Sequence, residues 1–138
     1  MKISFQNINA ADLHASTLAD LLVNIEADLE VMDHDEVVYS ERAFPVAELA
    51  RELVRWKASA PIPFDDFVFH SMSFDEVGSI RILEGRLGWI VGSVFAPDKK
   101  SKPLSWADLA SEIDEFVERV RAGVESLGID PHFILRSD

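Results

Sequence analysis

A short segment in the middle of the chain holds side chains of the types that a hydrolase uses. His70 is a candidate base, and Ser71 or Ser73 is a candidate nucleophile. Alternate side chains of a regular strand point to opposite faces, so neither serine would face His70. We therefore expect no catalytic residues, and a core histidine bonded to a backbone carbonyl or to a serine. The alternative is a small enzyme or ligand-binding domain that uses His70, Asp75 and Glu76.

Four adjacent residues, Asp33 to Glu36, carry side chains that can bind a cation. Neighbours at the tip of a hairpin rarely converge on one ion, so we interpret this segment as a solvated turn. The sequence has no cysteine, no glycine-rich phosphate loop and no His-Glu-x-x-His helix. Trp56, Trp89 and Trp106 could form a ligand cage, but each falls on the apolar stripe of its element, which favours core packing. We therefore expect neither a metal nor a cofactor.

The best candidate for function is a row of carboxylates at residues 26 to 30. Glu26, Asp28 and Glu30 alternate with apolar residues, so they lie on one face of a strand, about 6.8 Å apart. Like charges so close together repel one another and cost stability. This cost has a purpose if the row binds a basic cleft of a partner, because the charges would speed association and fix the orientation of the complex. The alternative is an ordinary wet face of an edge hairpin, kept from aggregating by charge. The candidate partner-binding residues are Glu26, Asp28, Glu30, Asp33, Asp35, Glu36, Glu112, Glu115 and Glu118.

The charge of the chain limits the partners that it can have. The sequence has 138 residues and a net charge of −12 at pH 7. Nine acidic residues and no Lys or Arg lie between Lys2 and Arg42, whereas residues 61–104 are nearly balanced. Phosphate groups repel acidic surfaces, so nucleic acid and anionic membrane are not expected as partners. A basic protein suits these surfaces, although acidity also serves solubility alone.

The composition predicts one domain, residues 1–138. Apolar residues make up 48% of the chain and charged residues 28%, which is an ordinary globular balance at a common domain size. No apolar run approaches the roughly 20 residues of a membrane-spanning helix. The first residues turn polar too early for a signal peptide. We therefore expect a cytoplasmic protein.

Hydrophobic periodicity predicts six strands and two helices. The first helix opens at Phe44-Pro45, places Glu48 and Arg51 on its wet side and ends before residue 59. The second is capped by Ser105 and ends at Gly128. The strands are expected at residues 2–8, 21–31, 36–41, 64–74, 79–84 and 87–95.

These elements predict an α+β domain in the order strand-strand-strand-helix-strand-strand-strand-helix. Short hairpin connections favour a mainly antiparallel sheet of five to six strands, with the two helices packed on one face. The strands from residue 64 onward are apolar on both faces, so we expect them in the centre of that sheet.

Three stretches of the sequence carry a family resemblance: Phe44–Trp56, Phe69–Ile80 and Gly88–Phe95. Their order and spacing resemble small acidic immunity-type proteins of bacterial toxin–immunity systems, including contact-dependent growth inhibition. Those proteins run from an acidic hairpin through a helix with a Trp near its end. They continue through a Ser-Met-Asp-x-Asp-Glu-x-Gly turn and a Gly-Trp strand to a closing acidic helix. Ser73 stands where that pattern has Asp.

The resemblance implies a non-enzymatic cytoplasmic protein that binds and silences a cognate protein toxin. The acidic face suits a basic toxin, for example a nuclease. Contact residues cannot be carried over, because such families diverge fastest where they touch their toxins. The candidate contacts therefore come from the charge pattern alone. A further alternative is a self-associating structural domain in which the segment Ile129–Leu135 pairs between chains.

Overall fold

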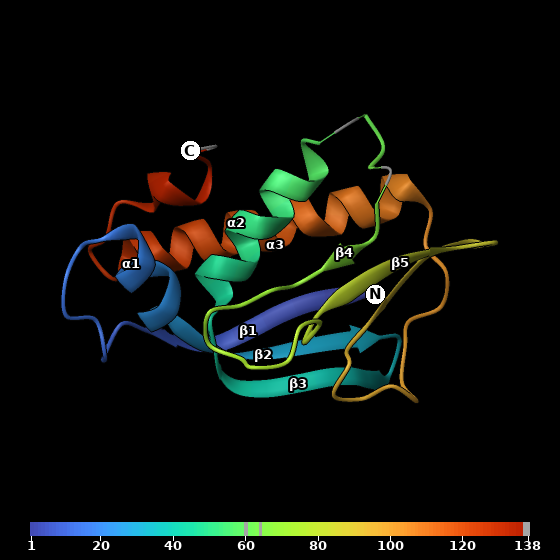
Figure 1. Ribbon diagram of the computed structural model, residues 1–138, viewed down its shortest axis with the longest axis horizontal. Coiled ribbons are helices and arrows are strands. Elements are labelled where there is room, and N and C mark those ends of the chain that lie inside the picture. The colour runs from blue at the N-terminus through green and yellow to red at the C-terminus, as the bar shows by residue number, and fades with distance from the viewer. Residues whose placement is uncertain (60, 64, 137–138) are drawn as a thin grey trace.

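The computed structural model describes residues 1–59, 61–63 and 65–136. In this part of the chain the strands form two separate three-stranded antiparallel sheets, accompanied by three α-helices and a 3-10 helix (Figure 1). The α+β class and the antiparallel pairing agree with the sequence. The predicted single sheet of five to six strands with two helices is wrong.

The first sheet has the strand order β1-β2-β3, built from Lys2–Asn9, Glu26–Asp33 and Glu36–Phe44. Both pairings are antiparallel, and β2 and β3 form the predicted hairpin. Ala27, Leu29 and Val31 are buried, so the alternation in β2 sets its inner face as expected. The other face of β2 is the candidate site.

Helix α1, Leu18–Asn24, replaces the first part of the strand predicted at residues 21–31. Thr17 caps it, because the Thr17 hydroxyl accepts a hydrogen bond from the N–H of Asp20 at 3.2 Å. The carboxylate of Asp20 in turn accepts from the side-chain amide of Asn24 at 2.7 Å and from the N–H of His14 at 3.1 Å. These local bonds stabilise a helix over a segment whose apolar pattern alone predicts a strand.

Helices α2, Val46–Lys57, and α3, Trp106–Ser126, pack against each other on one side of the first sheet (Figure 1). The predicted cap of α3 is confirmed, since the Ser105 hydroxyl accepts from the N–H of Asp108 at 3.1 Å. The 3-10 helix η1, Pro131–Ile134, contacts both helices. In the segment considered for pairing between chains, Phe133 and Ile134 are buried within this chain, whereas Leu135 is 43% exposed.

The second sheet has the order β4-β5-β6, built from Phe67–Val68, Arg81–Gly85 and Gly88–Gly92. The predicted strands at 64–74, 79–84 and 87–95 are therefore too long, and residue 64 lies outside the described residues. β4 is an edge strand, which contradicts the expected central position. The exposure of its outward side chain agrees with this position, because Val68 is 46% exposed.

Side-chain packing joins the two sheets, and one continuous core contains residues of both. Phe44 at the end of β3 packs on Phe69, just after β4, with ring centroids 5.7 Å apart. Trp56, Trp89 and Trp106 contact one another at centroid distances of 5.4 to 5.6 Å. These three rings connect α2, β6 and α3. The interpretation of the tryptophans as core residues agrees with this packing.

Candidate functional site

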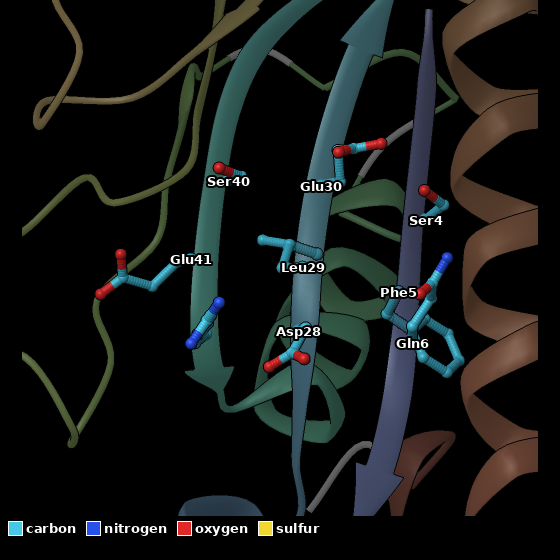
Figure 2. Close-up of a pocket in the computed structure, with 9 residues that line it drawn as sticks. Ser4, Phe5, Gln6, Asp28, Leu29, Glu30, Ser40 and Glu41 are labelled. Carbon is cyan, nitrogen blue, oxygen red and sulfur yellow. The ribbon is translucent and has the colours of Figure 1, made fainter.

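The outer face of the first sheet presents a row of polar side chains across all three strands. Glu30 of β2 lies between Ser4 of β1 and Ser40 of β3 in the strand register. Asp28 lies two residues before Glu30 on β2, opposite Gln6 of β1. Figure 2 shows these five side chains rising from the same face of the sheet, whereas Glu41 points away beyond the β3 edge.

The row lines an open hollow of about 550 Å³. Most of its lining side chains can form hydrogen bonds, and one, Arg42, is basic. A hollow of this kind can accept the end of a long basic side chain, with carboxylate and hydroxyl oxygens as acceptors. The lining residues are Ser4, Phe5, Gln6, Asp28, Leu29, Glu30, Ser40, Glu41 and Arg42.

Asp28 is held in place by both neighbouring strands. Its carboxylate accepts from the Asn7 side-chain amide at 2.9 Å and from the Ala43 N–H at 3.4 Å. The bond from Asn7, followed by that from Ala43, lowers the pKa of Asp28. Asn7 and Ala43 have φ angles of 60° and 52°, which are unusual for residues with a side chain. Asp28 therefore stabilises irregular backbone on each side of β2 and stays ionised.

Glu26 and Glu30, the other two carboxylates predicted to share a face with Asp28, differ in exposure. Glu30 is exposed, whereas Glu26 is partly buried. Burial, together with the charge of Asp12, raises the pKa of Glu26. Within the described ranges, no Lys or Arg forms an ion pair with Glu26, Asp28 or Glu30. Arg42 lines the same hollow, and its charge is a smaller cause of the lowered pKa of Asp28.

Asp33 at the hairpin tip serves the fold. It accepts a 2.7 Å hydrogen bond from the N–H of Lys102 and lies 3.5 Å from the Met1 amino group. Burial acts to raise its pKa, but these two groups outweigh burial, and the pKa of Asp33 is lowered. Asp35 and Glu36 are exposed at the same tip. Asp33 thus ties the loop after β6 to the hairpin.

The three helix carboxylates do not line the hollow. The Glu112 side chain is only 11% exposed and accepts from the N–H of Ile3 at 3.1 Å. Glu115 and Glu118 are ion-paired with Arg119 and Arg121, at 3.9 and 3.0 Å. Helix α3 runs along the β1 edge of the sheet (Figure 2). The structure therefore separates these residues from the row on β2.

A family profile described as a domain of unknown function, DUF7878, matches residues 1–126. The match begins before β1 and ends at the last residue of α3, so it covers both sheets and all three α-helices. The chain belongs to the DUF7878 family. No curated protein and no solved structure matches it significantly.

In this DUF7878 domain, the residues of the alternative enzyme site do not form a constellation. His70, Asp75 and Glu76 are all exposed, and no hydrogen bond or ion pair among the described residues joins any two of them. The expectation of a core histidine at position 70 is wrong. Across the described ranges, no three His, Asp or Glu side chains converge as metal ligands, and none of the helices has the length and apolar character that crossing a membrane requires.

A buried acid that the sequence places on the wet side of α2 organises the neighbouring loop. Glu48 is buried and accepts from the Ser71 hydroxyl at 2.6 Å and from the Met72 N–H at 3.2 Å. Burial is the main cause that raises the pKa of Glu48. Arg51, also placed on the wet side, is buried and donates to the carbonyl of Phe133 at 2.6 Å. Both residues hold the chain in its fold.

The sequence interpretation missed the neutral partners of the acidic row. Ser4, Gln6 and Ser40 come from the strands on either side of β2, and none of them carries charge. A signal was present, because Lys2, Ser4 and Gln6 alternate with apolar residues. Register between strands, which decides that Ser4 and Ser40 flank Glu30, is not visible in such a pattern.

Proposed function

We propose that this protein is an immunity protein that binds and neutralises a cognate bacterial toxin through the outer face of its first sheet. The observation that carries the proposal is the row Asp28 and Glu30, held on a rigid sheet without a Lys or Arg ion pair among the described residues. The resemblance of Phe44–Trp56 and the two later stretches to immunity-type proteins supports the same function. The proposed site of action is the cytoplasm.

Charge defines the partner in this proposal. A chain with a net charge of −12 attracts basic proteins over a distance of about 10 Å at ordinary salt and repels nucleic acid. A toxin that cleaves or binds nucleic acid needs a basic cleft for phosphate. Carboxylates on a rigid surface compete for such a cleft, since they satisfy the same Lys and Arg side chains. The toxin would lose its substrate site without any chemistry on the part of the immunity protein.

The hollow gives the proposed contact its geometry. A Lys or Arg from the partner would enter between Ser4 and Ser40 and reach the Glu30 carboxylate, which is exposed. Asp28 is fixed by Asn7 and Ala43, so its charge is held in place before binding and little order is lost. Asp35 and Glu36 at the hairpin tip would extend the contact and steer the encounter.

The test is a binding measurement with the protein encoded immediately upstream of this chain's gene. Purified wild-type protein should bind it in a one-to-one complex and abolish its toxicity when both are expressed together. Raising the salt to about 0.5 M should slow association, because screening shortens the range of the attraction. A neighbour that is not toxic and forms no complex at low salt would refute the proposal.

A further inference from the structure

The two edges of the first sheet differ in how their backbone groups are satisfied. At the β1 edge, the N–H of Ile3 donates to Glu112 at 3.1 Å, and the carbonyl of Ile3 accepts from Arg119 at 2.6 Å. Helix α3 therefore closes this edge. At the β3 edge, no strand among the described residues pairs with β3 other than β2.

The register shows which backbone groups of β3 point outward. Residues of an antiparallel pair alternate between those that bond each other and those that turn their N–H and C=O groups away. Ile3 lies opposite Val31, and the backbone N–H of Ile3 points away from β2, toward Glu112. The backbone groups of Val31 therefore point toward β3, and those of its neighbour Glu30 point toward β1. Ser40, which lies opposite Glu30, must then direct its N–H and C=O groups to the free edge.

A hollow of about 510 Å³ lies beside this edge, between residues 37–41 and 95–99. Val37 and Phe95 are 38% and 47% exposed there and offer apolar contact, while Glu41 is an exposed acid that points beyond the edge (Figure 2). Free backbone groups, an apolar recess and a carboxylate together match an extended segment that carries basic and apolar side chains.

We infer that the β3 edge receives an extended segment of the partner, which adds a fourth strand to the first sheet. This inference rests on the proposed function and names how the toxin would dock. The Ser40 N–H and C=O groups would bond the added strand, and Glu41 would pair with a Lys or Arg on it. Two copies of this chain are poorly suited to the same contact, because each carries a net charge of −12 and would bring its own Glu41 to the edge.

The first measurement is amide hydrogen exchange at single residues. In the free protein, the Ile3 amide should be protected and the Ser40 amide should exchange rapidly. When the upstream-encoded toxin is added, Ser40 should become protected. A Ser40 amide that is protected in the free protein, or that stays unprotected in a formed complex, would overturn the inference.

The matched variants are Ser40→Pro and Ser40→Ala. Proline removes the outward N–H and is tolerated on a free edge, whereas alanine keeps the amide and removes only the hydroxyl. We expect Ser40→Pro to weaken toxin binding by about tenfold or more and Ser40→Ala by less than about threefold. Equal binding by wild type and Ser40→Pro, with an unchanged melting temperature, would exclude strand addition while leaving the proposed function intact.

A synthetic peptide tests strand addition at the β3 edge without the toxin. A peptide of about ten alternating Lys and Val residues, a common strand length, should shift the amide resonances of residues 37–41 and 95–99, and a Glu-Val peptide should not. If no toxin binds the wild type, the proposed function fails and this peptide alone decides the edge. Shifts elsewhere, or with both peptides, would overturn the inference. A dimer that dissociates in Ser40→Pro would assign the edge to a second copy and also overturn it.

Discussion

The carboxylate of Glu112 accepts a hydrogen bond from the backbone N–H of Ile3 at 3.1 Å. Arg119 completes the arrangement, since its Nη2 atom lies 2.6 Å from the Ile3 carbonyl oxygen and 3.3 Å from Glu112. Two side chains of α3 thus satisfy the backbone groups that a further strand would otherwise bond. Glu112 belongs to the fold, although its place in an acidic helix suggests a surface contact.

Replacing Glu112 by alanine should therefore destabilise the protein. The Ile3 N–H would lose its acceptor in a partly buried place, and we expect a loss of about 1–3 kcal/mol in the free energy of unfolding. Urea denaturation measures this loss. The control is Glu115→Ala on the same helix, where the side chain is 62% exposed and a change within about 0.5 kcal/mol is expected. Equal effects of the two variants would contradict a structural role for Glu112.

Local periodicity predicted the elements well where one face is buried and the other wet. The alternation at Ala27, Leu29 and Val31 and the cap at Ser105 are both confirmed. It failed at α1, because the Thr17 and Asp20 hydrogen bonds stabilise a helix that the apolar pattern does not reveal. It also failed at the level of sheets, since apolar runs do not tell whether a strand bonds a neighbour or only packs against it.

The sequence predicted which face carries the acidic side chains of the candidate site, but not which residues of the same chain those side chains contact. That Asp28 and Glu30 share the outer face follows from the period of two. That Asp33 instead holds the loop at Lys102 depends on a contact between residues 69 positions apart, which no local pattern encodes. The burial of Glu48 is similar, because its partner Ser71 lies in the loop after β4, 23 positions along the chain.

Glu48 should make the stability of the protein depend on pH in a defined direction. Burial raises its pKa above 4.5, so the folded state holds the proton to a higher pH than the unfolded state does. The contribution of Glu48 to the free energy of unfolding is therefore most favourable below pH 4.5, and it falls as the pH rises through the raised pKa. Relative to Glu48→Gln, which does not titrate, the wild type should lose stability as the pH rises above about 4.5.

Urea denaturation across that pH range tests the prediction for Glu48. The control is Glu125→Gln, since Glu125 is exposed on α3 and is not ion-paired among the described residues. The stability difference between wild type and Glu48→Gln should decrease as the pH rises. Glu125→Gln shows what the loss of one exposed carboxylate does over the same pH range. A pH-independent difference for Glu48→Gln would show that its carboxyl is not perturbed in the fold.

The tryptophan cluster should dominate the stability of the contact between the second sheet and the helices. Trp89 is 4% exposed and lies between Trp56 and Trp106. Trp89→Ala should cost about 3–5 kcal/mol, because it removes a large buried ring and leaves a cavity. Leu87→Ala is the control, since Leu87 is 86% exposed two residues away. Thermal unfolding that ranks the two variants equally would contradict a core role for the cluster.

Charge reversal at Glu30 should slow binding to the toxin without changing the fold. Glu30 is exposed at the centre of the outer face, whereas Asp28 bonds Asn7 and Ala43, so its reversal would confound folding with binding. We expect Glu30→Lys to lower the association rate about three- to tenfold at low salt, with a smaller effect at high salt. Glu125→Lys changes the net charge equally on α3, away from the hollow, and should alter the rate far less. Stopped-flow or surface-binding kinetics gives both rates, and an equal decrease for the two variants would mean that net charge, rather than the outer face, drives the encounter.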